Sequence, residues 1–280
     1  MKKIMKKKIS VVIPTYNREK ELLQSIKTVI NQTYKGIIEI VIIDDSKESS
    51  ENKIENNFSK ILKKGKRKIK YIHKAKKEGS PLARNIGIEE SEGKYIAFLD
   101  DDDLWLPEKL EKQAKILDQN EKVGLVVCNS LDKRFGKERV SKPLMIASHE
   151  LILKSFNLSS SSSYLVRKST LEKVGGFDIS LASAQEYDLA IRISKIKDVK
   201  CVDEVLMIQN ATEGQISENW NRKIKGLLSV YTKHKEDYNS VSIFNTIKLV
   251  GILGLYMIGF LIGNKIYSVI IPFKERYEEK

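Results

Sequence analysis

The stretch YIAFLDDDDLWLP, residues 95–107, decides the fold and the chemistry expected of this chain. An apolar run of strand-forming residues ends in four consecutive aspartates, and Pro107 then marks a helix start. Four adjacent carboxylates repel one another, and a bound Mg²⁺ or Mn²⁺ would neutralise them, since these cations prefer carboxylate oxygens and usually share them with substrate phosphates. The alternative is a solvated acidic loop without a function.

The composition is that of a globular protein. The chain has 280 residues, of which 41% are hydrophobic, enough for one large domain or a domain with an appendage. Its formal net charge of +13 would suit nucleic acid, an anionic membrane surface or phosphorylated ligands. The lysine-rich runs at 2–8 and 63–68 have no interleaved aromatics to stack on bases, so we expect no nucleic-acid partner.

Two cysteines, Cys128 and Cys201, lie in apolar, strand-like runs and form no CxxC pair. We expect both to be reduced core residues. The apolar run 9–13 is too short for a signal-peptide core. A cytoplasmic location is therefore expected.

The first hundred residues alternate between strand and helix patterns. Near-continuous apolar runs at 9–13, 37–43, 69–72 and 95–99 predict buried strands, and the segments between them predict helices at 18–32, at 48–64 and from Ser80, with Ser80 as cap and Pro81 in the first turn. This order predicts an α/β fold with a mostly parallel central sheet covered by helices.

Polar residues follow three of these strands, at 14–17, at Asp44–Asp45 and at Asp100–Asp103. The carboxyl ends of parallel strands form the edge where open α/β sheets bind ligands. Neither GxGxxG after the first strand nor GxxxxGK[ST] is present. A nucleotide bound here would rely on carboxylates and a metal.

The second half carries further elements of both kinds. They are a helix from 107 to about 120, a strand at 124–128, a loop or small hairpin at 129–147, a polar strand lining a site at 159–166, a helix at 169–174 stopped by Gly175–Gly176, a helix at 184–195 and a strand at 199–208.

Six short motifs now stand in a fixed order: VVIPTYN at 11–17, IDDS at 43–46, ARN at 83–85, FLDDDD at 98–103, GGFD at 175–178 and QEYDL at 185–189. Over roughly residues 9 to 217 the chain resembles glycosyltransferase family 2, the nucleotide-sugar transferases with the GT-A fold. The resemblance implies one α/β domain with a nucleotide-binding first half and an acceptor-binding second half.

The resemblance also implies roles for single residues. Asp102 would hold a divalent metal, Mn²⁺ or Mg²⁺, with Asp100 in the metal shell or on the ribose, and Asp103 would cap the following helix. The nucleotide would be held by Pro14, Thr15, Tyr16, Asn17, Asp45, Arg84, Asp100 and Asp101, with Asp45 accepting from the base and Arg84 facing the base or the diphosphate.

Glu186 matches the general base, although family members commonly have Asp at this position. Its carboxylate reaches about one methylene further and can still take a proton from an acceptor hydroxyl. The alternative is that Glu186 and Asp188 only favour a helix N-terminus electrostatically. A second departure is that Met207–Asn210 lacks the basic residue or His often found there.

The C-terminal part is a hydrophobic helical appendage. Residues 243–263 are apolar except for Asn245 and Lys248, and as a helix they would span roughly 30 Å. We expect a transferase domain at 1–217, a helical connector at 218–242 and a membrane-associated segment at 243–280, with contact through Ile243 to Phe273. The alternative is a core helix packed on the domain.

Together these features imply an inverting, metal-assisted hexosyltransferase of cell-surface polysaccharide biosynthesis at the inner face of the membrane. The donor would be a nucleotide sugar, with a UDP-sugar expected first, and the acceptor a saccharide or lipid-linked hydroxyl. The alternatives are a nucleotide-sugar-binding module without turnover and, least favoured, a basic nucleic-acid-binding protein.

Overall fold

The structure is a computed structural model that describes residues 7–63, 65–133, 138–143, 145–154, 160–210 and 220–241. The chain divides into two compact units, one of Met1–Ile179 with Gln185–Glu213 and one of Ser180–Ala184 with Gly214–Lys280. In the second unit the described helices are α8 (Trp220–Lys233) and α9 (Lys235–Val241). The expected membrane segment at 243–280 lies outside the described residues.

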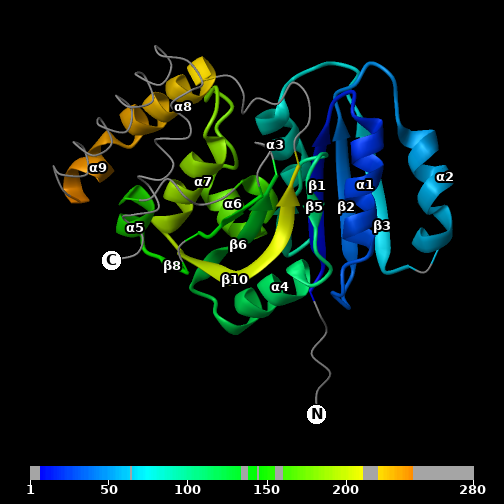
Figure 1. The fold of residues 1–280 in the computed structure, drawn as a ribbon, viewed down its shortest axis with the longest axis horizontal. Helices are drawn as coiled ribbons and strands as arrows, with labels where there is room; N and C mark the ends of the chain where they lie inside the picture. The colour runs from blue at the N-terminus through cyan, green and yellow to red at the C-terminus, as the bar shows by residue number, and fades with distance from the viewer. Residues whose placement is uncertain are drawn as a thin grey trace. The chain divides into compact units, whose positions relative to one another are not determined.

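The first half of the larger unit is a parallel sheet in the order β3-β2-β1-β4 (Figure 1). Its strands are β1 (Ile9–Thr15), β2 (Ile38–Asp44), β3 (Arg67–His73) and β4 (Tyr95–Phe98), and the helices between them are α1 (Glu19–Ile30), α2 (Glu51–Leu62) and α3 (Ser80–Glu90). The predicted alternation of strands and helices is confirmed.

Alternating side chains of β2 explain why this strand is apolar along its whole length. Ile40 and Ile42 belong to the core that includes the buried faces of α1 and α2, whereas Val41 and Ile43 pack with Ala83 of α3. A parallel strand covered on both faces needs apolar residues at successive positions.

The second half adds strands of both directions. The sheet continues from β4 through β9 (Leu165–Arg167), β6 (Val123–Asp132), β10 (Asp198–Gln209) and β5 (Leu104–Trp105). Strand β9 is antiparallel to both β4 and β6, whereas β6 and β10 are parallel. The predicted α/β class with a mostly parallel sheet is confirmed; the antiparallel β9 joins its two parallel parts.

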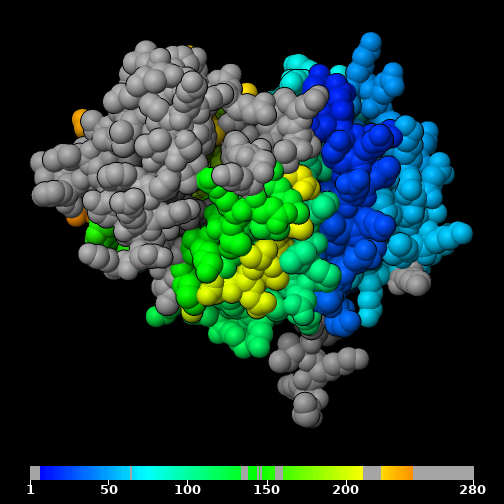
Figure 2. Space-filling view, in the orientation of Figure 1, coloured from blue at the N-terminus to red at the C-terminus, as the bar shows by residue number. Residues whose placement is uncertain are grey.

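The remaining elements are small strands and helices around β6 and β10. They are α4 (Lys109–Gln119), β7 (Arg139–Ser141) paired with β6, β8 (Ile146–Ala147) paired with β10, α5 (His149–Lys154), α6 (Lys168–Val174) and α7 (Gln185–Ser194). In the space-filling view, described atoms of the first half in blue to cyan meet those of the second half in green to yellow (Figure 2).

Three local expectations are wrong. Residues Ser161–Ser163 form a 3₁₀ turn, η1, rather than a strand. Helix α3 has Gly79, with φ 94°, at its N-cap position, so Ser80 is already helical. Asp103 does not cap the next helix, because β5 intervenes and α4 has Glu108 at its N-cap position.

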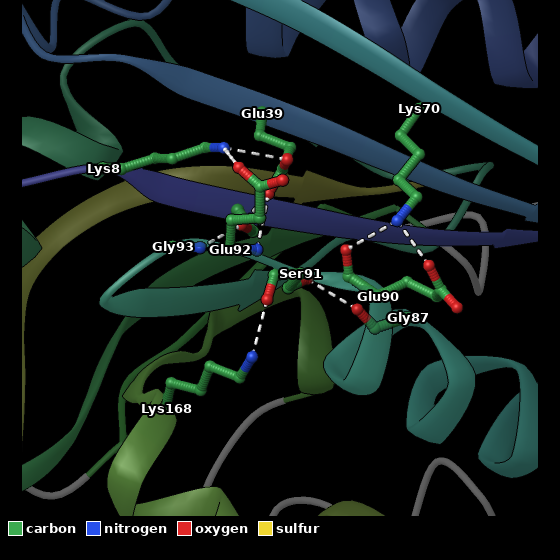
Figure 3. A network of polar contacts seen from close by, with 10 residues as sticks. Lys8, Glu39, Lys70, Gly87, Glu90, Ser91, Glu92, Gly93 and Lys168 are labelled. Carbon is green, nitrogen blue, oxygen red and sulfur yellow. Dashed lines mark hydrogen bonds and ion pairs between the residues drawn. The ribbon is translucent and has the colours of Figure 1, made fainter.

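A polar network joins the amino-terminal ends of β1 and β2 to the α3–β4 connection (Figure 3). The buried Glu39 accepts hydrogen bonds from Ser10 Oγ (2.5 Å), Lys8 Nζ (2.9 Å) and the Glu92 amide (2.9 Å). Ser10 Oγ also accepts from the Gly93 amide at 2.8 Å. Buried polar contacts thus fix the amino-terminal edge of the parallel sheet. The loops that carry the polar motifs lie at the opposite, carboxyl-terminal edge.

Both cysteines are free and buried, as expected of core residues. Across the ranges given above, no helix is long and apolar enough to cross a membrane.

Candidate functional site

Loops that follow β1 and β4 meet at the carboxyl edge of the parallel sheet. Thr15 is the last residue of β1, and its Oγ1 donates to Asp101 Oδ2 at 2.8 Å. Both groups are buried. Two predicted site residues that are far apart in sequence are therefore in direct contact.

Two arginines pair with the first three aspartates of the acidic loop, Asp100–Asp103. Arg18 Nη1 donates to Asp102 Oδ2 at 2.7 Å and to Asp101 Oδ1 at 3.2 Å. Arg84 Nη2 donates to Asp100 Oδ1 at 2.5 Å. Asp101 and Asp102 thus share one guanidinium and Asp100 has another, and both positive charges reduce the repulsion among the three carboxylates.

Asp101 is the most deeply buried carboxylate of the three. Burial, together with the negative charges of Asp102 and Asp100, raises the pKa of Asp101 to about 7, although the Thr15 hydrogen bond and the Arg18 charge lower it. A positive charge bound beside Asp102 would favour the ionised form of Asp101.

The backbone of the acidic loop is held by residues that the sequence analysis did not single out. Ser162 Oγ of η1 accepts from the Asp100 amide at 3.0 Å, and the Ser162 carbonyl accepts from Trp105 Nε1 at 2.8 Å. Asn210 Nδ2, just after β10, donates to the Asp102 carbonyl at 3.1 Å. The serine run at 159–163 was the available sequence signal, since polar residues beside a strand can line a site.

The two carboxylate oxygens of Asp45 differ in their hydrogen bonding. Its Oδ2 accepts from the amides of Glu78 (3.0 Å) and Gly79 (3.2 Å). Its Oδ1 is buried and has no hydrogen-bond partner within the described part of the chain. A buried acceptor left unpaired is costly, so this oxygen suits an N–H group of a ligand.

The loop after β1, which carries Tyr16, runs beside the loop that carries Asp45. Tyr16 is 39% exposed, and Lys77 Nζ lies 4.2 Å from its ring centroid. Asn17 has a left-handed φ of 55°, and its amide donates to Ser46 Oγ at 2.7 Å. Pro14 is buried inside β1 opposite Ile43.

Arg84 is buried on α3 and faces an aromatic side chain as well as Asp100. Its guanidinium carbon lies 5.4 Å from the Phe177 ring centroid, and Phe177 packs edge-on against Phe98 of β4 at 5.0 Å. The GGFD segment at 175–178 therefore contacts both the helix and the strand that carry the predicted nucleotide site.

Glu186 lies in the first turn of α7 and is half-buried. The buried Tyr164 donates through Oη to the Glu186 carbonyl at 3.2 Å, and burial together with the Glu186 carboxylate raises the pKa of Tyr164. Because Ser162 binds the acidic loop and Tyr164 binds α7, the short segment 162–164 connects the two.

Asp188 is explained by local structure. It is fully buried and forms an ion pair with Arg192 one turn later at 2.7 Å. This i,i+4 pair stabilises α7.

No three His, Cys, Asp or Glu side chains gather as a metal-binding group in the described ranges. This arrangement still fits Mn²⁺ or Mg²⁺, because such ions are held by one or two carboxylates together with substrate phosphates. Asp102 and Asp100 are kept near guanidinium groups and stand at the ligand-binding edge. Both would be available to a cation that is bound together with a phosphorylated ligand.

Residues 10–173 match the family model for Glycosyl transferase family 2. The match covers more than half of the chain, and the chain belongs to this family. The predicted family is thus confirmed.

Curated relatives are themselves uncharacterized glycosyltransferases. One from Rickettsia bellii is 50% identical over 113 residues, which is 40% of this chain and 15% of the relative. One from Methanocaldococcus jannaschii is 29% identical over 283 residues, covering 97% of this chain and 95% of the relative. The chain spans only 15% to 18% of the length of three Rickettsia relatives.

Solved structures show the fold. S. aureus TarS 1–349 in complex with UDP-GlcNAc matches with a TM-score of 0.63 at 18% identity, over 80% of this chain and 66% of that one. The mannosyltransferase PcManGT from Pyrobaculum calidifontis, in complex with GDP-Man and Mn²⁺, matches with a TM-score of 0.66 at 15% identity, over 96% and 79%. The fold is that of the GT-A glycosyltransferases.

Proposed function

We propose that this chain is an inverting, metal-assisted hexosyltransferase that moves a sugar from a nucleotide-diphosphate sugar to a hydroxyl of a saccharide or lipid-linked acceptor. The observation that carries the proposal is the convergence of Thr15, Arg84 and the acidic loop at one sheet edge of a family 2 chain. A UDP-sugar is the first donor to test.

The donor would be bound by groups that the fold leaves available. Asp45 Oδ1 would accept an N–H group of the base, and the exposed aromatic ring of Tyr16 comes from the residue after Thr15, whose carbonyl accepts from the Asp45 amide. Asp102 and Asp100 would hold a divalent cation, which when bound offsets the charge that develops on the departing nucleoside diphosphate.

Glu186 would act as general base on the acceptor. Its carboxylate takes the proton from the acceptor hydroxyl while that oxygen bonds to the anomeric carbon. The bond between the anomeric carbon and the phosphate oxygen breaks in the same displacement, so the configuration inverts. The anchoring of the α7 amino terminus by Tyr164 supports this role, because it fixes the backbone from which Glu186 extends.

The decisive experiment is calorimetric titration of UDP and GDP into the protein with and without Mn²⁺. We expect metal-dependent binding of one nucleotide, loss of that binding in Asp102→Ala, and its retention in Glu186→Gln. Glu90→Gln, which removes only an exposed partner of Lys70, is the matched control. A wild-type protein that binds neither nucleotide with Mn²⁺ would contradict the proposal.

Turnover separates a transferase from a binding module. Product NMR with a panel of sugar nucleotides and acceptors should show transfer by the wild type and none by Glu186→Gln. Nucleotide binding without product or donor hydrolysis from any donor would favour the module instead.

We further propose that residues 243–273 hold the enzyme at the cytoplasmic face of a membrane, where lipid-linked acceptors for surface polysaccharides are found. The apolar run at 249–263 and the flanking basic residues support this. Full-length protein should pellet with membranes and resist high salt, and removing 243–280 should release folded protein. Full-length protein that stays in the supernatant, with a truncated form that unfolds, would make the segment part of the core.

A further inference from the structure

The proposed site has a charge requirement that the described end of β10 does not meet. A nucleoside diphosphate is bound most tightly where a cationic side chain accompanies the metal. The segment Met207–Asn210, at the end of β10, contributes the amide of Asn210 to the acidic loop and no cation. A positive side chain for the diphosphate must therefore come from another part of the fold.

Arg18 is placed to supply that charge from the first half. It lies between β1 and α1, directly after Tyr16 and Asn17, and its guanidinium bridges Asp101 and Asp102. Its side chain is 29% exposed, whereas the carboxylates that it contacts are 7% and 10% exposed. The guanidinium thus covers the two carboxylates from the solvent side.

Arg84 is more deeply buried than Arg18. Its side chain is 8% exposed, it pairs with Asp100, and it lies against the Phe177 ring. Each arginine thus contacts one of the two carboxylates that the proposed function assigns to the metal, Arg84 at Asp100 and Arg18 at Asp102. Arg18 is the more exposed of the two, and its second carboxylate contact, with Asp101, would still hold its guanidinium if a cation took Asp102.

We infer that Arg18 binds the diphosphate of the donor. The inference rests on the proposed function and adds a residue that the family motifs did not indicate. A cation held by Asp102 would leave the guanidinium its contact with Asp101, which Thr15 holds in place, and would free the N–H groups that face Asp102. The diphosphate that accompanies such a cation would offer phosphate oxygens, which guanidinium groups bind in pairs.

The test compares nucleotide with nucleoside. Calorimetry with Mn²⁺ present would titrate UDP and uridine, or GDP and guanosine, into the wild type, Arg18→Met and Arg18→Lys. Lys53→Met, which removes an exposed ion pair with Glu19 next to Arg18, is the control. Thermal melts verify that each variant is folded, and Arg18→Lys keeps the positive charge if Arg18→Met does not fold.

We expect Arg18→Met to weaken diphosphate binding about tenfold or more, Arg18→Lys to weaken it by less, and both to leave nucleoside binding unchanged. If wild type and both variants bind the diphosphate equally, Arg18 is only a counter-ion of the acidic loop and the inference is wrong, while the proposed function stands. If the variants bind the diphosphate more tightly, Arg18 only competes with the metal, and the inference is equally wrong. A wild type that binds no nucleotide overturns both.

Discussion

Asn85 and Phe177 exchange two hydrogen bonds across the site. The Asn85 side-chain amide donates to the Phe177 carbonyl at 2.8 Å, and its oxygen accepts from the Phe177 amide at 2.7 Å. This pair fixes the GGFD segment to α3, next to the arginine that binds Asp100. The second half of the domain, to which the family resemblance assigns acceptor binding, is thereby joined to the helix that carries Arg84.

Two neighbouring glycines should respond differently to substitution by alanine. Both have left-handed φ angles, 78° at Gly175 and 66° at Gly176, but a Cβ at Gly175 meets nothing within 4 Å, whereas one at Gly176 would lie 2.5 Å from Asn85 Oδ1. Gly175→Ala should cost about 1 kcal/mol of unfolding free energy, and Gly176→Ala about 2–4 kcal/mol. Urea unfolding measures both, and equal losses would show that the Asn85 contact does not matter.

Ser162→Ala should weaken metal-dependent nucleotide binding about three- to tenfold, because the Asp100 amide loses its hydrogen-bond acceptor and the acidic loop loses a fixed point. Ser160→Ala is a matched control on the same segment, since Ser160 Oγ is buried and has no hydrogen-bond partner within the described ranges. Calorimetry with UDP or GDP and Mn²⁺ measures the difference. A similar loss in both variants would point to a general loosening of η1.

Glu39→Gln should destabilise the protein by about 1–3 kcal/mol at pH 7, through loss of the charge that Ser10, Lys8 and the Glu92 amide bind. Burial acts to raise the pKa of Glu39, but these contacts outweigh it and lower the pKa below its ordinary value. The stabilisation is therefore present above pH 5 and is lost as the pH falls through the folded-state pKa. The difference in unfolding free energy between wild type and variant should be smaller at pH 4 than at pH 7.

The control for that experiment is Glu90→Gln. Glu90 and Lys70 form an ion pair in which both side chains are more than two-fifths exposed, so its loss should cost clearly less than the loss of the Glu39 charge. If the two substitutions lower the unfolding free energy equally at pH 7, the burial of Glu39 does not increase the stabilisation that its charge provides.

Lys109→Met should stabilise the protein by about 2 kcal/mol at pH 7. Burial lowers the pKa of Lys109 to about 8, from an ordinary 10.5, although its Nζ donates to Gln113 Oε1 at 2.8 Å. Between these two pH values the unfolded chain holds more protons, so wild-type stability rises with pH relative to the variant. Unfolding measured from pH 7 to 10 should show the advantage of Lys109→Met declining, and the exposed Lys115→Met on the same helix should show no such trend.

Local sequence patterns were sufficient for the first half of the fold, because β1, β2 and β4 are buried along their whole length and read as apolar runs. They were insufficient for β9 and β5, which have three and two residues and leave no periodicity to detect. The partners of the acidic loop were missed for a different reason. Ser162 and Arg18 reach it from 62 and 84 positions away, and only the folded chain brings such residues together.

The position of β9 between β4 and β6 affects strand pairing during translation. Strand β4 pairs with β1 on one edge, and its other edge pairs with residues 165–167, which are synthesised roughly 70 residues later. At roughly 5–20 residues per second, the ribosome leaves that apolar edge open for several seconds. A nascent chain halted in this interval would present an unpaired strand next to the aspartates, and exposed edges of this kind recruit other chains. Translation of the segment before residue 165 is thus a stage at which an exposed strand edge could lead to aggregation.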